Sequence, residues 1–274
     1  MEGPGAALTT YPLSDLALSQ RLERCEARAN AALVEARGAP AAWMECAGAY
    51  AMFDGAGSPL TQTFCLGMFA TPSSADLDRI ESFFSERGAE TFHEVSPMAG
   101  FDVVNLLTKR GYRVVELASV LFLPLSPLGG ERVAEGRVRG ATFANISNDI
   151  DLIATLSAEG WSEFPEVGPF IRDLARMSAT AQGATPFIAE IDGRPAATGT
   201  LIMHDGVALL AGASTIPSAR HRGAQRALLE ARLAHAAAHG CDLAMMCAAP
   251  GSASQRNAER QGFRIAYTRI KWGR

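Results

Sequence analysis

The order of apolar and polar residues predicts a mixed α/β protein, most clearly in the C-terminal half. An alternating stretch at 141–146 predicts a strand, and amphipathic stretches at 148–160 and 169–182 predict two helices. Asp-Gly pairs then separate alternating runs at 186–191, 196–203 and 207–215, which is typical of strands joined by tight hairpins. A helix, a strand, a helix and a last strand are predicted at 225–239, 242–249, 252–261 and 262–272.

The N-terminal half repeats the last four elements of this pattern. A helical stretch at 76–87, a strand-like stretch at 89–96, a helix at 102–110 and a strand-like stretch at 111–125 follow one another there. Three landmarks match between the halves, at separations of 152, 153 and 151 residues: Gly88 with Gly240, Pro97 with Pro250, and Gly111 with Gly262. A nearly constant separation indicates two copies of one fold.

A stretch rich in proline and glycine, residues 124–140, lies between the two patterns and predicts a linker. We expect a first domain at 1–128, a linker at 129–136 and a second domain at 137–274. The expected fold class is α/β, with two mixed-sheet domains in tandem, each a central, mostly antiparallel sheet flanked by helices. Apart from the first dozen residues, nothing in the sequence indicates disorder.

Composition narrows the class of function. The 274 residues are 48% hydrophobic and 20% charged, as in a typical globular protein, and the net charge of −4 offers no overall basic surface for nucleic acid. The five cysteines are scattered, without a metal-binding or redox spacing. With no signal peptide and no long apolar stretch, we expect a cytoplasmic protein with no membrane partner.

Several catalytic patterns do not occur in the sequence. It has no nucleotide-binding P-loop, no Gly-x-Gly-x-x-Gly linked to a strand and no Gly-x-Ser-x-Gly nucleophile turn. His235 and His239 lie four residues apart, which places both rings on one face of a predicted helix. No further ligand accompanies them nearby in the sequence, so we expect no metal site.

A basic turn, SARHRGAQR at residues 218–226, precedes the helix predicted at 225–239 and is unusual in an acidic chain. A helix N-terminus binds phosphate because it has free N–H groups and the positive end of a dipole. Gly223, which has no Cβ, would let the backbone approach such a ligand closely. The turn is either a phosphate site or a solvated loop, and the strand that ends just before it favours the phosphate site.

The same stretch resembles the acyl-CoA-binding turn of the GCN5-related N-acetyltransferases, the GNAT family. That family's motif, Gln/Arg-x-x-Gly-x-Gly/Ala after a strand, is matched by Arg220 and Gly223, whereas Gln225 stands where Gly or Ala is usual. The closing NAERQGF at 257–263 and the order of elements extend the resemblance to about residues 137–272. The first copy has acidic residues in the equivalent stretch, FATPSSADLDR, so it looks like a degenerate GNAT-like copy.

The resemblance implies acetyl-CoA as a co-substrate, with its pyrophosphate at the basic turn and its pantetheine arm between the strands predicted at 207–215 and 242–249. An N–H near Ser214–Ile216 would polarise the thioester carbonyl. Gln225 is expected either to turn toward solvent or to distort the turn, and Asn257 to bind the arm or to cap the local backbone. The implied cofactor-binding residues are Ser214, Thr215, Ile216, Arg220, Arg222, Gly223, Ala224, Gln225, Arg226 and Asn257.

The usual proton donor of the family is missing. Many members protonate the leaving thiolate with a tyrosine four residues before the Gly-Phe pair, a position that is Ala258 here. Tyr267 on the last predicted strand is the candidate catalytic acid, with packing against a helix as an equal alternative. Cys247 is expected to be a buried apolar residue, because direct attack of the amine needs no covalent intermediate.

Acceptor binding would fall to the connection between the two helices predicted at 148–160 and 169–182. Trp161, Glu163 and Phe164 are the candidate substrate-binding residues, in an acidic rim completed by Glu159 and Glu166 that suits a cationic amine. A solvent-exposed loop with both aromatic residues in the core is the equal alternative.

We therefore expect an N-acetyltransferase that moves an acetyl group from acetyl-CoA to the amine of a small molecule or peptide, acting as a monomer or homodimer. Three alternatives stay open: a non-catalytic acyl-CoA-binding or sensor protein, an aminoacyl-tRNA-dependent transferase, and a structural protein. The net charge of −4 disfavours the RNA-dependent alternative.

Overall fold

The computed structural model describes residues 11–125 and 142–274, so the predicted linker at 129–136 lies outside the described residues. Its strands form one eleven-stranded sheet in the order β1-β2-β3-β4-β11-β5-β10-β9-β8-β7-β6. The strands are β1 (Ala42–Cys46), β2 (Ala49–Phe53), β3 (Gln62–Phe64), β4 (Phe92–Val95), β5 (Arg113–Pro124), β6 (Thr142–Ile146), β7 (Ala184–Ile191), β8 (Arg194–His204), β9 (Val207–Thr215), β10 (Leu243–Ala248) and β11 (Arg264–Gly273). The helices are α1 (Leu16–Arg37), α2 (Ser74–Ser85), α3 (Phe101–Lys109), α4 (Ile150–Glu159), α5 (Gly168–Thr180), α6 (Ala224–Ala238) and α7 (Ala253–Arg260).

Every element predicted in the C-terminal half is present, with bounds within two residues of the prediction. The two Asp-Gly pairs form the predicted hairpin turns. Asp192 and Asp205 have φ values of 54° and 47°, and the glycines after them are also left-handed. Two consecutive positive φ values match the right-handed twist of the paired strands, which is why Asp-Gly is favoured at both turns.

The mixed α/β fold class is confirmed, and the sheet is mostly antiparallel, with parallel pairing between β3 and β4 and between β9 and β10. The two predicted sheets are, however, continuous. β5, from the first half, pairs with β10, and β11, from the second half, pairs with β4. This exchange buries each last strand between two others, so neither is left as an unpaired edge.

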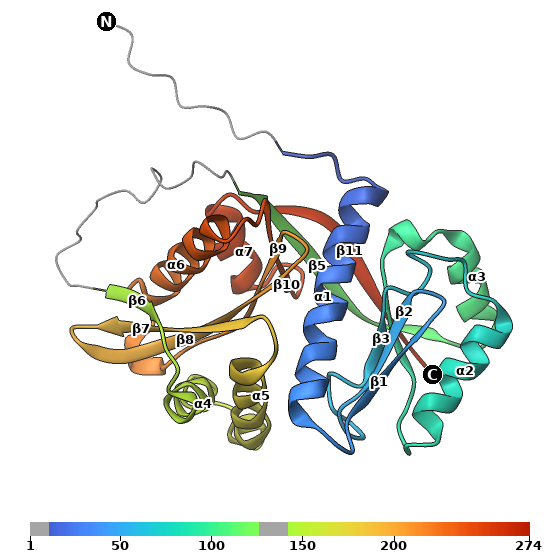
Figure 1. Cartoon of the computed structure of the whole chain (residues 1–274), viewed down its shortest axis with the longest axis horizontal. Coiled ribbons are helices and arrows are strands. Elements are labelled where there is room, and N and C mark those ends of the chain that lie inside the picture. Colours follow the sequence, from blue (N-terminus) through green and yellow to red (C-terminus); the bar gives the residue numbers. More distant parts are fainter. Residues whose placement is uncertain (1–10, 126–141) are drawn as a thin grey trace, which may run out of the picture.

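The order helix–strand–helix–strand occurs twice, as α2-β4-α3-β5 and as α6-β10-α7-β11. Figure 1 shows α2 and α3 on one side of the paired strands β5 and β11 and α6 and α7 on the other, with α6 and α7 on the opposite face of the sheet from α4 and α5. Apolar side chains of α6 and of the strands it covers form one core cluster, which includes Leu228, Leu201 and Leu121. This arrangement directs the N-terminus of α6 toward the end of β9.

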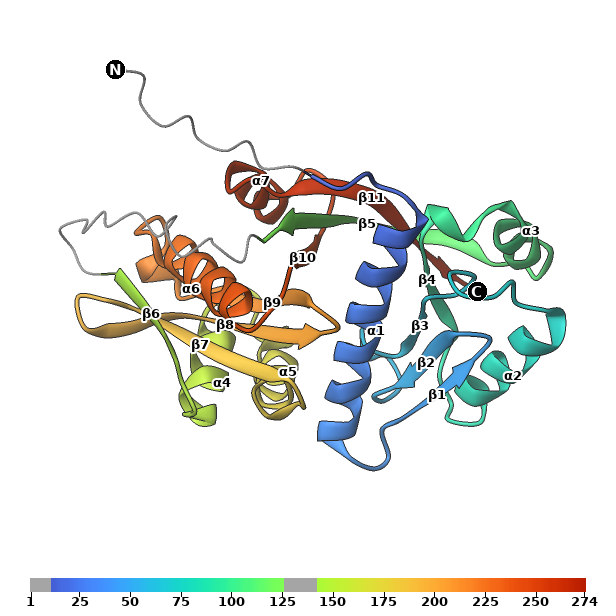
Figure 2. The ribbon, with the colours of Figure 1, turned by 45° about the horizontal axis from the view of Figure 1, so that its top comes forward.

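Helix α1 was not predicted from the sequence, although it is the longest helix described. It runs between the two halves (Figures 1 and 2), and it is buried on most of its circumference. One side packs with strands of the second half through Leu18, Leu22 and Cys25, and another packs with β2 and β3 through Ala27 and Val34. None of the helices in the described residues is both long and apolar enough to cross a membrane.

Candidate functional site

Strands β9 and β10 separate partway along their length, as predicted. They pair in parallel over three residues, from Val207 with Leu243 to Leu209 with Met245, and the pairing ends there. β9 continues to Thr215 and β10 to Ala248. The unpaired halves of the two strands leave main-chain groups on facing edges, where a third extended chain has hydrogen-bonding partners.

A bulge in β9 accounts for the separation. Thr198 of β8 lies opposite Ser214 and Thr200 lies opposite Ala211, so β9 has one extra residue at this point. Such a bulge bends the strand away from its neighbour. The guanidinium of Arg232, buried on α6, donates to the main-chain oxygens of Thr200 and Ala211 beside the bulge.

The turn before α6 leaves its helix N-terminus uncapped. Gly223 precedes the helix with a left-handed φ of 87°, and no side chain caps the helix. The first main-chain N–H bonded back to the turn is that of Ala227, which donates to the Gly223 oxygen. Among the described residues, no main-chain acceptor is recorded for the three preceding N–H groups, those of Ala224, Gln225 and Arg226. These three donors and the helix dipole match the requirements of an anion.

The equivalent helix of the first half is capped by its own side chains. Ser73 and Asp76 form a reciprocal capping box at the start of α2. Hydrogen bonds from Ser73 hold the pKa of the Asp76 carboxyl below its usual value, so a negative charge already occupies this helix end. The contrast with α6 follows from the acidic residues in this stretch of the sequence.

Each arginine of the basic turn has a carboxylate partner. Arg220 pairs with Glu163 at 2.7 Å and also donates to the Gly160 oxygen at 2.9 Å. Arg222 pairs with Asp192 and Arg226 with Glu230, both at 2.6 Å and both exposed. Exposed ion pairs contribute about 0–1 kcal/mol, so the last two arginines exchange partners at little cost.

Gln225 does not distort the turn, nor does it extend into solvent. Its amide donates to the Thr215 hydroxyl at 2.6 Å and so joins the start of α6 to the end of β9. The Ile216 N–H donates to Ala196 of β8 and is therefore not available to a thioester. Because N–H directions alternate along an antiparallel pair, the Thr215 N–H lies on the edge of β9 that faces β10.

The end of α4 packs closely on the last residues of β9. The Ser214 hydroxyl donates to the Ser157 oxygen at 3.1 Å, so its side chain faces α4. A Cβ on Gly160 would lie 1.9 Å from that hydroxyl oxygen and 3.1 Å from the Thr215 nitrogen. Glycine is therefore required at 160, a contact that sequence reasoning missed.

The connection between α4 and α5 presents its aromatic side chains to solvent. Trp161 is 43% and Phe164 is 51% exposed, with ring centroids 6.3 Å apart. The alternative that both lie in the core is wrong. Glu163 joins this connection to the basic turn through its ion pair with Arg220.

Three residues named from the sequence lie on α7 and β11. Tyr267 is buried on β11, which β5 separates from β10, and its hydroxyl donates to Glu23 of α1 at 2.9 Å. This contact favours the alternative that Tyr267 packs against a helix, and its role as the catalytic acid stays a prediction. Asn257 is exposed on α7 and accepts from Arg260, and Ala258 is buried without a polar group.

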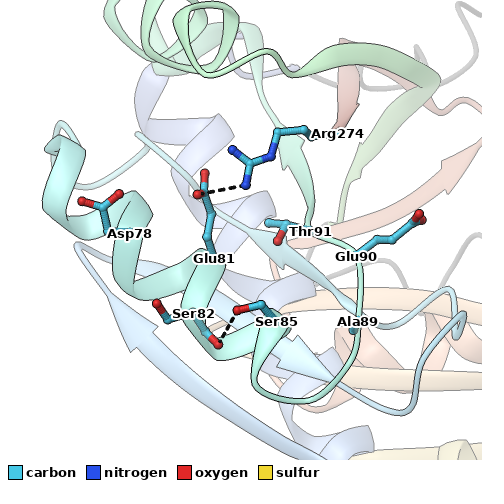
Figure 3. Close-up of a pocket in the computed structure, with 8 residues that line it drawn as sticks. All are labelled: Asp78, Glu81, Ser82, Ser85, Ala89, Glu90, Thr91 and Arg274. Carbon is cyan, nitrogen blue, oxygen red and sulfur yellow. Dashed lines mark hydrogen bonds and ion pairs between the residues drawn. The ribbon is translucent and has the colours of Figure 1, made fainter.

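Two surface hollows of about 380 Å³ lie beside α2, remote from the basic turn. Figure 3 shows the first, in which Arg274 pairs with Glu81 among other polar side chains of α2 and the segment before β4. Within residues 11–125 and 142–274 there is no group of three or more His, Cys, Asp or Glu residues able to hold a metal ion. His235 and His239 stack on each other with ring centroids 3.9 Å apart.

Comparison with known proteins agrees with the fold. Residues 151–263 match the family model described as "Acetyltransferase (GNAT) family". None of the curated proteins compared with the chain matches it.

Solved structures resemble the chain over most of its length. A GCN5-related N-acetyltransferase from Kribbella flavida is 17% identical, with a TM-score of 0.65 over 90% of this chain and 94% of that one. A tandem GNAT protein from the clavulanic acid biosynthesis pathway is 13% identical, with a TM-score of 0.59 over 95% and 96%. The C-terminal domain of a putative lysylphosphatidylglycerol synthetase from Agrobacterium fabrum is 14% identical, with a TM-score of 0.53 over 93% and 92%.

These similarities establish the fold, because identities this low do not carry a substrate from one protein to another. The matched segment begins within α4 and ends just before β11, so it contains the separated strands and the basic turn. Residues 151–263 therefore form a GNAT-family domain, in a chain whose fold is shared with a tandem GNAT protein.

Proposed function

We propose that the chain is an N-acetyltransferase that moves the acetyl group of acetyl-CoA to a primary amine by direct attack in a ternary complex. The observation that carries the proposal is the uncapped start of α6 at a left-handed Gly223, beside the separated ends of β9 and β10. The match of residues 151–263 to the GNAT family makes an acyl-CoA the expected ligand for this combination.

In this proposal the N–H groups of residues 224–226 bind the pyrophosphate. Arg222 and Arg226 leave their exposed carboxylate partners and add charge to the same site. The Thr215 N–H lies within the expected range Ser214–Ile216 and on the edge of β9 that faces β10, where it donates to the pantetheine arm. Gln225 supports this donor by holding the Thr215 side chain.

We further propose that the first half binds no acyl-CoA. Its equivalent strands β3 and β4 pair only between Thr63 and His93, so they also separate. A Cβ on Gly67, just after β3, would lie 2.3 Å from Val103 and 3.0 Å from Ala99, so this loop is packed directly on the start of α3. This close packing at the end of β3, together with the capped start of α2, supports the proposal that the first half holds no acyl-CoA.

Thermal unfolding with acetyl-CoA tests the proposal, with adenosine as the control that lacks both phosphates and thioester. Acetyl-CoA at about 100 times its dissociation constant stabilises the folded state by roughly 2.7 kcal/mol, a shift of several degrees for a chain of this size. The expected result is a shift that adenosine does not reproduce. Equal melting temperatures with and without acetyl-CoA would overturn the proposal.

A non-catalytic acyl-CoA-binding or sensor function is the second candidate. Two observations favour it. Ala258 has no proton to donate, and the Tyr267 hydroxyl already donates a hydrogen bond to Glu23. Release of free CoA thiol in the presence of an amine, but not in its absence, would dismiss this candidate. We also retain as proposals a cytoplasmic location, a monomer or homodimer, and the absence of nucleic-acid and membrane partners.

A further inference from the structure

A buried polar cluster lies between α1 of the first half and the last strands of the second. Arg269 of β11 is at its centre, 3% exposed, and makes ion pairs with three carboxylates. These are Glu26 at 2.6 Å, Glu94 at 3.0 Å and Glu23 at 3.4 Å. Three carboxylates thus share one guanidinium, and a further cation is favoured near them.

The excess of negative charge in this cluster affects Glu23, its most buried carboxylate. Glu23 is fully buried, and one of its carboxylate oxygens, Oε2, has no hydrogen-bond partner among the described residues. Burial raises the pKa of Glu23 to about 7 and also raises that of Glu94, against the attraction of Arg269. The cluster is therefore short of positive charge and of hydrogen-bond donors.

The cluster reaches the gap side of the sheet through Glu26 and Cys247. The Glu26 side chain is 12% exposed, whereas that of Glu23 is not exposed at all. The expectation that Cys247 is a buried apolar residue is wrong: it is half-buried, whereas the other four cysteines are buried, and its thiol donates to Glu26 Oε2 at 3.2 Å. Arg269 donates to the same sulfur at 3.4 Å, so Cys247 marks the accessible end of the cluster.

This accessible end lies at the gap between β9 and β10. Cys247 comes two residues after Met245, the last residue of β10 that pairs with β9. It packs in the same apolar cluster as Ala211 of β9, on the face of the sheet that α1 covers. A pantetheine arm that enters the gap from the basic turn points toward this end, so the Glu26 carboxylate lies beside the proposed position of the thioester at the far end of the arm.

We propose that Glu26 binds the acceptor and removes its proton, and that the acceptor is consequently a primary amine that is cationic in solution. The inference rests on the proposed acetyl transfer and names the substrate class for the same site. It also assigns a role to the first half, which supplies Glu26 through α1. The acidic rim at Glu159, Glu163 and Glu166 is then the outer part of the approach.

The proton balance of this step is simple. The ammonium of the acceptor gives one proton to the Glu26 carboxylate, and the free amine forms a bond with the thioester carbon. The carbon–sulfur bond then breaks, and the CoA thiolate takes up one proton from the Glu26 carboxyl. The ammonium loses two protons in all: the first goes to Glu26, and the second passes from the new amide nitrogen to water. No covalent enzyme intermediate forms, so Cys247 takes no part in the transfer itself.

Charged thiol reagents test the inference on the full chain without a known acceptor. Two methanethiolsulfonates of similar size, one with a trimethylammonium group and one with a sulfonate, both form a mixed disulfide with Cys247 and release methanesulfinate. Mass spectrometry of the Cys247 peptide gives each rate under mildly alkaline conditions. We expect the cationic reagent to react faster, Glu26→Gln to lower this preference about tenfold, and acetyl-CoA to slow both reagents.

Glu94→Gln is the matched control, because it removes a carboxylate from the same arginine but on β4, away from Cys247. It should retain the preference, and an equal loss in both variants would reduce Glu26 to a structural partner of Arg269. Equal rates of the two reagents on the unmodified chain would also overturn the inference. If acetyl-CoA raises the melting temperature yet fails to protect Cys247, the inference fails while acetyl-CoA binding stands. If acetyl-CoA does not raise the melting temperature, the proposed function fails first.

Discussion

Gly223 and Gly240 lie at the two ends of α6 and have nearly the same backbone conformation, with φ of 87° and 83°. A Cβ added at either position would meet no heavy atom within 4 Å. Valine at either site therefore carries the same penalty, the cost of a β-branched side chain at positive φ, on the order of 1–2 kcal/mol. The two substitutions should lower the free energy of unfolding about equally.

They should differ in acetyl-CoA binding. Gly223→Val drives the turn out of the left-handed region, and the N–H groups of residues 224–226 no longer converge on one point. A hydrogen bond to a charged group contributes about 1.5–3 kcal/mol, so the loss of one such bond weakens binding roughly 10- to 100-fold. Gly240→Val leaves this end of the helix unchanged and should bind as tightly as the unmodified chain.

Isothermal titration with acetyl-CoA measures the affinities, and denaturant unfolding measures the stabilities. The reasoning is refuted if Gly223→Val binds acetyl-CoA as well as Gly240→Val while both lose comparable stability. A similar weakening in both variants would show that general destabilisation, not the turn, controls binding.

Three further predictions concern the surroundings of the site. Asp192→Asn should tighten acetyl-CoA binding and Arg222→Ala should weaken it, each by a few-fold at low salt, since the carboxylate competes for the arginine; titration at two ionic strengths checks this. Gly160→Ala should cost about 1–3 kcal/mol of stability, and most of the loss should disappear when Ser214 is also replaced by alanine, as a double-mutant cycle in urea would show. Burial favours the neutral form of Glu23 in the folded state, so the fold loses stability as pH rises from about 4.5 to about 7. Glu23→Gln should remove this loss and gain up to about 3 kcal/mol relative to the unmodified chain above pH 7, by chemical unfolding across that range.

The elements of the second half and the location of the basic turn follow from local sequence patterns. These features are local: alternation sets the strands, Asp-Gly sets the hairpins, and Gly223 marks a left-handed residue before a helix. The predicted duplication also agrees with the repeated order of elements, since landmarks such as Gly88 and Gly240 both have positive φ after a helix.

Which side chains meet depends on the packing of the whole chain. The exchange of β5 and β11 depends on pairing between strands about 150 residues apart, and no local pattern encodes it. α1 escaped prediction because it is buried on several sides and so lacks one apolar stripe. The sequence also does not reveal that Glu26 lies beside Cys247, or that Tyr267 donates a hydrogen bond to Glu23, because these residues are more than 200 positions apart. Contacts between residues far apart in the chain follow from packing, whereas a turn follows from its own residues.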